Sequence, residues 1–190
     1  MAKWLLACGA FALMAAQEKA PQNPDLKYLP NWGVSVMRPP KPRNEEWDLK
    51  DAGVKFKSQL SVSHKVNDVN IEFLIQEPAT GMAAYDPKEA GEALFKDLSG
   101  SPNLKDGKKR APIKASKLPG NGAGGVNAWY LEMEFKDADK KVEFRTWSFI
   151  GRENQCLYRI VLITGEGMYT KYQKEILYIF STIRLFKLPK

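Results

Sequence analysis

Five side chains suited to ion pairing and stacking fall within three neighbouring apolar-rich segments: Tyr130, Glu132, Arg145, Trp147 and Arg159. If the segments form hairpins, Tyr130 lies near Trp147, Glu132 near Arg145, and Trp147 near Arg159. Cross-strand Glu–Arg pairs and Arg–Trp stacking stabilise such a face. Aromatic and arginine side chains are also common in binding hot spots. Two interpretations are open: an exposed platform for a partner, or a face covered by a helix with its charges paired at the rim.

Catalysis would have to use carboxylates, because other reactive groups are scarce. The chain has one histidine, His64, and two cysteines, Cys8 and Cys156. Ser–His and Cys–His schemes would therefore depend on His64 alone, and zinc sites need several Cys or His ligands. Glu132 and Glu134 could act as an acid–base pair, but residues two apart on a strand share a face that is often simply solvated. We expect a protein that is not an enzyme, with a carboxylate-dependent hydrolase or lyase as the alternative.

The segment Gly120–Gly125 matches the pattern G-x-G-x-x-G. In dinucleotide-binding proteins this pattern follows a strand and opens a helix, whose N-terminus receives the pyrophosphate. Here it precedes Val126–Phe135, which alternates like a strand. Asp137 and Asp139 lie in an expected turn but lack the other ligands of a calcium loop. We expect a loop at the glycines, and neither a cofactor nor a metal.

The chain is basic, with 29 lysines and arginines against 22 acidic residues and a net charge of +7. A basic balance favours anionic partners. The lysines are spread along the chain, however, which is typical of solvated side chains. No RNA-binding or zinc-finger signature accompanies them. We expect a protein or another anionic molecule as the partner, and no nucleic acid.

The first 16 residues have the composition of a secretory signal peptide. Lys3 provides the positive charge, and Trp4–Ala16 is a run of about 13 apolar or small residues, shorter than the roughly 20 needed to span a bilayer. Cleavage near Ala16 would remove Cys8 and leave no intrachain disulfide. The alternative is lipidation, because Leu5–Cys8 resembles a bacterial lipobox. The protein would then be tethered to a membrane, and a membrane partner is expected only in that case.

Residues 17–30 contain three prolines and no periodicity, which predicts a linker. Residues 31–190 then form a single domain. An Asp86-Pro87 start and Gly100 predict a helix between them, and Lys105–Arg110 predicts a basic turn. Strands are predicted at 32–38, 54–66, 69–75 and 113–118, an antiparallel meander at 126–135, 141–150 and 155–164, and a helix at 168–182 with a short extension to 186.

This order of elements, with Gly33-Val-Ser-Val36 in the first strand and the ending Ile179-Phe-Ser-Thr-Ile-Arg184, resembles the PsbP-like superfamily, which includes Mog-like proteins. The resemblance covers about residues 31–187. It implies an α+β fold in which helices flank an antiparallel sheet as an α/β/α sandwich, and binding or assembly roles rather than catalysis. It carries over no site residue. The sequence thus predicts an exported, secreted or periplasmic, soluble binding or accessory protein.

Overall fold

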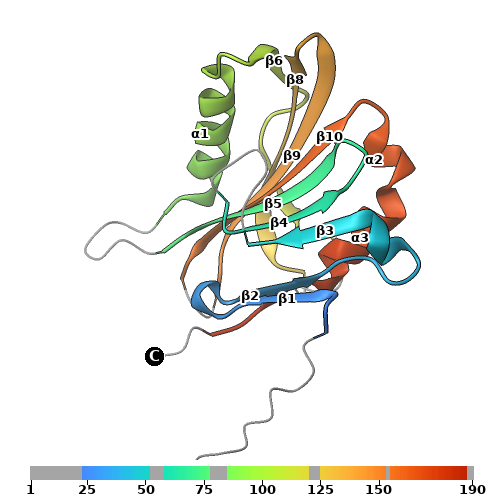
Figure 1. The fold of residues 1–190 in the computed structure, drawn as a ribbon. Helices are drawn as coiled ribbons and strands as arrows, with labels where there is room; N and C mark the ends of the chain where they lie inside the picture. The colour runs from blue at the N-terminus through green and yellow to red at the C-terminus, as the bar shows by residue number, and fades with distance from the viewer. Residues whose placement is uncertain (1–22, 52–57, 78–84, 120–124, 153–154, 188–190) are drawn as a thin grey trace, which may run out of the picture.

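An antiparallel sheet of eight strands forms the centre of the part of the chain that the computed structural model describes, residues 23–51, 58–77, 85–119, 125–152 and 155–187. Its strand order is β3-β4-β5-β10-β9-β8-β6, and β7 also pairs with β8 (Figure 1). The strands are β3 (Trp47–Lys50), β4 (Leu60–His64), β5 (Val69–Gln76), β6 (Leu104–Lys109), β7 (Lys114–Lys117), β8 (Asn127–Asp137), β9 (Lys140–Ile150) and β10 (Leu157–Gly165).

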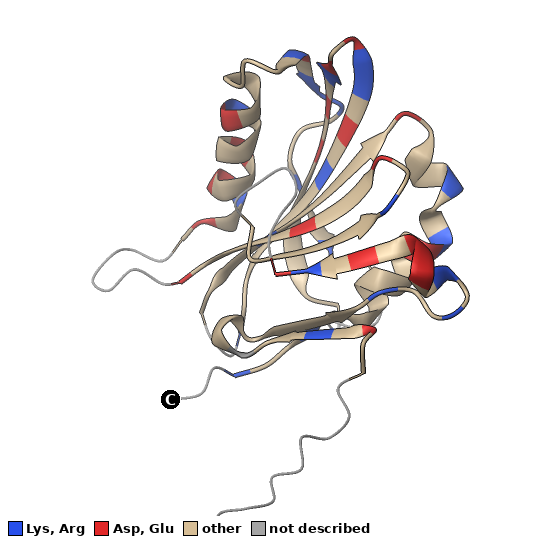
Figure 2. Cartoon of the chain, viewed as in Figure 1, with Lys and Arg blue, Asp and Glu red and all other residues tan. Residues whose placement is uncertain are grey.

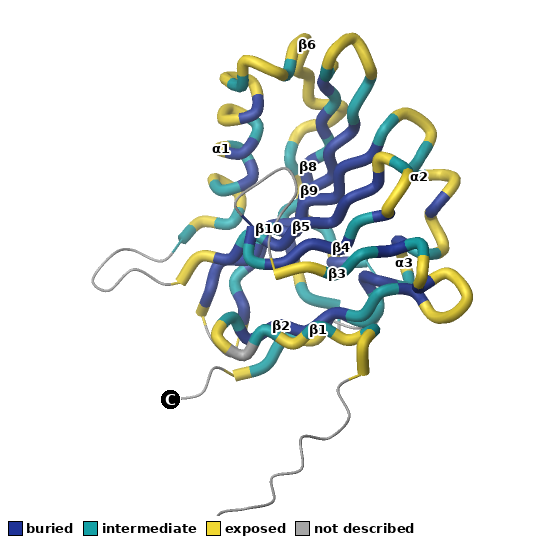
Figure 3. The backbone as a smooth tube through the Cα atoms, in the orientation of Figure 1, coloured by how far each residue is buried: buried dark blue, intermediate teal, exposed yellow. Residues whose placement is uncertain are grey.

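The predicted meander of β8, β9 and β10 is confirmed, with antiparallel pairing throughout. Both faces of β9 are buried: Phe144 packs on one side and Trp147 on the other. In Figure 3 the deeply buried backbone follows these central strands, whereas the outer side of α1 and the β6 edge are exposed. A sheet buried on both faces must have a covering layer on each side, because its apolar side chains point both ways.

One layer is helix α1 (Pro87–Ser99), which packs against β8, β9 and β10. The predicted start is confirmed, because the Asp86 carboxylate accepts a hydrogen bond of 2.7 Å from the backbone N–H of Lys88. The Asp86 cap satisfies a backbone donor that the first turn of the helix would otherwise leave unpaired. Further along the helix, Leu94 and Leu98 pack into an apolar cluster with the sheet.

The second layer combines helices with a small sheet. Helices α2 (Met168–Lys171) and α3 (Gln173–Thr182) lie over the opposite face with a three-stranded antiparallel sheet of β1 (Leu26–Leu29), β2 (Val34–Met37) and β11 (Arg184–Leu185). Short 3-10 turns at Pro30–Trp32 and Arg43–Glu46 precede β2 and β3. Val34, Val36, Ile179 and Phe180 are buried in the main core with Trp147. The expected α+β arrangement, an antiparallel sheet flanked by helices, is confirmed, with a small sheet beside the helices on this face.

The single helix expected at 168–182 is interrupted at Tyr172, whose φ of −107° and ψ of 17° are not helical. The tyrosine ring lies 4.7 Å from the His64 ring and 6.3 Å from the Trp47 ring, between centroids. Its hydroxyl accepts a hydrogen bond of 2.7 Å from the side chain of Asn67. The break therefore directs Tyr172 into the core at a point where helical periodicity alone predicts continuation.

Three predictions of secondary structure need correction. Residues 26–29, assigned to the linker, form strand β1, because they pair with β2. Lys105–Arg110 is not a turn: its first five residues belong to the edge strand β6, which pairs with β8 around an irregularity between Lys105 and Lys108. Strand β3 was not predicted. Three predicted features lie wholly or partly outside the described residues: the signal peptide at 1–16, the start of the expected strand at 54–57, and the glycine loop at 120–124.

Candidate functional site

The register of β8 and β9 places Tyr130 opposite Trp147 and Glu132 opposite Arg145, as the sequence predicts. Arg159 is different: it lies opposite Ser148, on the other face of the sheet. Gln155 and Cys156 were predicted to begin the strand, but β10 begins at Leu157. The pairing of β10 with β9 is therefore shifted by one residue from the predicted register, and Ile160 lies opposite Trp147. A shift of one residue moves a side chain to the opposite face. Four of the five predicted residues therefore lie together, and Arg159 does not.

The interpretation of this face as an exposed platform is wrong. Trp147 is 6% exposed and packs against Phe180 of α3, with ring centroids 4.9 Å apart. Arg145 is 8% exposed, and its guanidinium carbon lies 4.1 Å from the ring centroid of Tyr169 in α2. The second interpretation, in which a helix covers the aromatic residues and the charges are paired, describes the arrangement.

The charges are paired through Arg110, which follows β6. Its guanidinium group donates to Glu132 at 3.0 Å, to Glu134 at 2.8 Å and to Glu143 at 2.8 Å. Arg145 donates to Glu132 at 3.0 Å and to Glu143 at 2.9 Å. We call these five residues the Arg110 network. Figure 2 shows the charged residues interspersed with neutral ones along β8 and β9.

The surroundings of Glu134 and Arg110 favour the ionised forms of these two residues. The Arg110 side chain, followed by those of Lys108 and Lys141, lowers the pKa of Glu134 to about 2. Hydrogen bonding to Glu134 raises the pKa of Arg110 above its ordinary value, and burial raises that of Tyr130. A general acid must carry a proton near neutral pH. Glu134 does not, so it is poorly suited to be the general acid of a pair with Glu132.

Cys156 and His64 also have structural surroundings. Cys156 is fully buried, and burial raises the pKa of its thiol, which disfavours the nucleophilic thiolate. The Nδ1 atom of His64 accepts hydrogen bonds of 3.2 Å from the backbone N–H groups of Val66 and Asn67, and its Nε2 atom lies 3.5 Å from Glu46. Among the described residues, no group of three or more histidines, cysteines or carboxylates could hold a metal.

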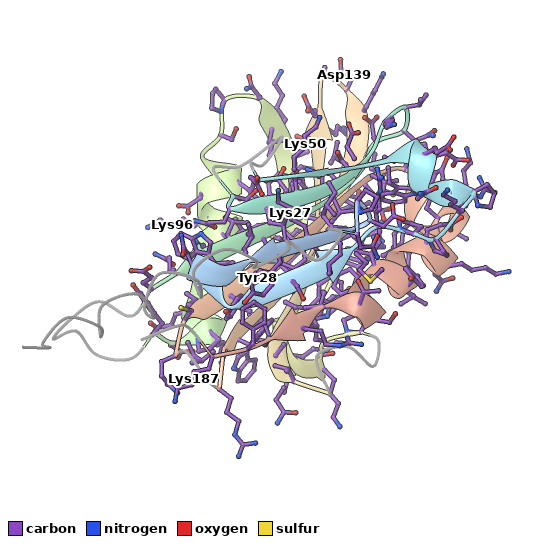
Figure 4. The ribbon with its side chains drawn as sticks, turned by 60° about the horizontal axis from the view of Figure 1, so that its bottom comes forward. Lys27, Tyr28, Lys50, Lys96, Asp139 and Lys187 are labelled. Carbon is purple, nitrogen blue, oxygen red and sulfur yellow. The ribbon has the colours of Figure 1, made fainter. Side chains whose placement is uncertain are left out.

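A cleft with a volume of about 870 Å³ opens at the end of the sheet where the β4–β5 turn, the β8–β9 turn and the β10–α2 connection meet. Val142 and Ile163 supply apolar lining, while Asp48, Lys50, Asp139 and Lys140 supply charged lining. Lys50 and Asp139 are labelled in Figure 4. A smaller hollow of about 350 Å³ beside the end of α1 shares Val142 and Ile163 with it. Pockets of several hundred Å³ with mixed lining are typical of ligand sites.

Asn70 is the most informative residue in the cleft. It is 7% exposed, and its Nδ2 atom donates a hydrogen bond of 2.5 Å to the Glu72 carboxylate. Its Oδ1 atom is buried and has no hydrogen-bond partner. A buried acceptor without a partner is unfavourable by about 1–3 kcal/mol. Asn70 therefore holds an unused acceptor beside the cleft.

Lys141 connects the cleft with the Arg110 network. It lines the cleft, and its ammonium group lies 3.3 Å from Glu134 and 3.4 Å from Glu166. Turns at 67–68 and 136–140 were predicted from the sequence, but the cleft was not. The missing information was the strand order, because β5 lies beside β10 and brings distant turns to one end of the sheet.

The fold is PsbP-like. The chain is similar to cyanobacterial PsbP (CyanoP) from Synechocystis sp. PCC 6803, with 14% identity and a TM-score of 0.55, over 96% of this chain and 99% of that one. It is also similar to a protein from Bacteroides thetaiotaomicron, with 12% identity and a TM-score of 0.52, over 86% of this chain and 48% of that one. No family model and no curated protein matches the chain.

Proposed function

We propose that this protein is an exported accessory module that binds a partner molecule without transforming it, and that the cleft at the end of the sheet is its binding site. The observation that carries the proposal is the buried Oδ1 atom of Asn70, which lacks a hydrogen-bond partner and lies beside a cleft of about 870 Å³. Because that oxygen is itself buried, a ligand in the cleft that donates a hydrogen bond would satisfy it once the Asn70 side chain turns toward the cleft. The mixed lining suits a molecule with both polar and apolar parts.

The state of the carboxylates supports a binding role over catalysis. Glu134 is held in its ionised form by Arg110, Lys108 and Lys141. In the cleft, Asp48 pairs with Lys50 at 3.1 Å, and Glu166 pairs with Lys141 at 3.4 Å. Carboxylates already engaged by cations are poorly placed to exchange protons with a substrate. In this proposal the Arg110 network, with Tyr130 and Trp147, holds β8, β9 and α2 in place behind the cleft.

Capture of the partner tests the binding role. The tagged full chain would be incubated with the native envelope fraction, and the retained molecules identified by mass spectrometry. The variant Lys50→Glu/Lys140→Glu reverses two exposed charges of the cleft, and Lys96→Glu/Lys105→Glu reverses two exposed charges outside it. We expect the partner to be lost with the first variant and retained with the second. Equal retention by both variants would remove the cleft from the proposal.

Export is tested by the mass of the mature protein. Cleavage near Ala16 gives a chain that begins at about Gln17, which is the expected result. A chain that begins at Cys8 with added acyl mass would instead establish the membrane-tethered form, and an intact Met1 would contradict export by cleavage. Within the described residues, no helix combines the length and apolar character needed to cross a membrane.

A further inference from the structure

The small sheet has an unusual outer face. Its inner face carries Val34 and Val36, which are fully buried. An antiparallel sheet with one buried face normally carries polar side chains on the other. Here the outward positions are mostly apolar, and we call four of these side chains the outer patch: Leu26, Tyr28, Met37 and Phe186.

Two side chains of the outer patch are exposed, and Met37 and Phe186 are half-buried beside them. Leu26 is 42% exposed and Tyr28 is 54% exposed, which makes them two of the four large hydrophobic side chains most exposed among the described residues. The rings of Tyr28 and Phe186 stack, with centroids 4.7 Å apart and planes inclined at 24°. Tyr28 and Lys187 are visible at this side of the molecule in Figure 4. Contiguous apolar surface of this kind marks an interaction site more often than isolated exposed residues do.

Cations border the patch. Arg184 lies opposite Ser35, which lies opposite Tyr28, so the three residues form one row across the sheet. Arg184 and Lys187 are exposed. The Arg184 guanidinium group donates to the backbone carbonyls of Ser181 and Ile183, which hold it at the end of α3 without neutralising it. Aromatic side chains bordered by cations suit the boundary between lipid headgroups and acyl chains.

The N-terminal segment leads directly to this patch. The apolar stretch Trp4–Ala16 precedes β1, and Leu26 is the tenth residue after Ala16. Ten residues span at most about 35 Å when fully extended. A bilayer that holds the leader, during export or as an anchor, therefore lies within reach of the outer patch. A patch tethered so closely meets the membrane at high effective concentration.

We propose that the outer patch docks on the surface of a bilayer that contains anionic lipids. A second copy of the chain is a poorer occupant, because a stable protein interface usually takes about 20–30 residues on each side. The patch has four apolar side chains, which suits shallow insertion at an interface. This role is separate from the cleft, which lies at the end of the large sheet.

Vesicle binding by the full chain tests the proposal. Vesicles of phosphatidylcholine with phosphatidylglycerol would be compared with vesicles of phosphatidylcholine alone. We expect tighter binding to the anionic vesicles, weakened by salt. Leu26→Ser/Tyr28→Ser should lower the binding constant by about tenfold or more, because two exposed apolar groups no longer enter the interface. The leader is the same in every variant, so the difference reports on the patch.

The matched control is Val66→Ser/Leu177→Ser, which removes the other two large exposed hydrophobic side chains in the described part of the chain. It should bind vesicles like the parent, and thermal unfolding should show that both double variants are folded. Equal binding by both variants, or an equal loss, would overturn the proposal. So would a dimer in sedimentation velocity that Leu26→Ser/Tyr28→Ser dissociates. Lys50→Glu/Lys140→Glu should bind vesicles normally, so this test and the partner-capture test can fail separately.

Discussion

Trp147 of β9 packs against Phe180 of α3, with ring centroids 4.9 Å apart and ring planes inclined at 64°. This contact attaches the C-terminal helix to the centre of the sheet. It also explains why the aromatic and charged residues of β8 and β9 do not form an open surface. Tyr130, whose ring centroid lies 5.2 Å from that of Trp147, extends the same packing toward the Arg110 network.

Trp147 and Arg159 should respond differently to substitution, although sequence reasoning grouped them. Trp147→Ala removes a buried ring and should destabilise the fold by about 3–5 kcal/mol. Arg159→Met should change stability by less than about 1 kcal/mol, because the Nε atom of Arg159 is buried without a partner and the apolar stem is kept. Urea unfolding measures both. Similar losses would contradict the separation of these residues onto opposite faces.

Arg110 should contribute more to stability than a typical exposed cation. Arg110→Gln leaves the carboxylates of Glu132, Glu134 and Glu143 with fewer partners, and we expect a loss of about 2 kcal/mol, below the value for a fully buried pair because Arg110 is partly exposed. Lys105→Gln, in the strand β6 that leads to Arg110, is the control, with an expected change within about 0.5 kcal/mol. Equal free energies of unfolding for the two variants would show that the network contributes nothing.

Glu134 should contribute to the pH dependence of stability. Its pKa falls from the ordinary value of 4.5 to about 2 in the folded protein, mainly through the hydrogen bond with Arg110. Its contribution is therefore fully present above about pH 5 and is lost as the pH falls toward about 2. The stability difference between the parent and Glu134→Gln should shrink across that interval, as measured by urea unfolding at a series of pH values. A constant difference would contradict the lowered pKa.

Gly107 should tolerate no side chain. A Cβ atom at this position would approach the Cδ1 atom of Phe135 to 2.8 Å, and the Phe135 ring is buried. Gly107→Ala should destabilise the protein by about 1–3 kcal/mol through overpacking. Gly100→Ala is the control, because a Cβ atom there meets its nearest neighbours at 3.6 Å. Thermal unfolding compares the two variants, and an unchanged melting temperature for Gly107→Ala would refute the close contact.

Local patterns were enough to predict much of the fold. The period-two alternation of β8, β9 and β5 identifies these strands, and the Asp86-Pro87 cap identifies the start of α1. Pairing between neighbouring strands was also accessible where the turn was short, so the pairs Tyr130–Trp147 and Glu132–Arg145 were correct. Each of these features depends on residues close together in the chain.

Other features depended on contacts between distant segments. The longer turn before β10 reversed the face of Arg159, and the packing of Tyr172 against His64 and Trp47 interrupted the C-terminal helix. The strands β1 and β6 are short or polar, and they are held in place by pairing with β2 and β8.

The sequence by itself determined the antiparallel meander, the capped helix and the basic character of the chain, because these follow from residue type and spacing. Only the tertiary structure decided that Trp147 is covered, that Asn70 lies beside a cleft, and that Leu26 and Tyr28 remain on the surface. Burial and proximity depend on which distant strands and helices become neighbours, and that order is set by the packing of the whole core.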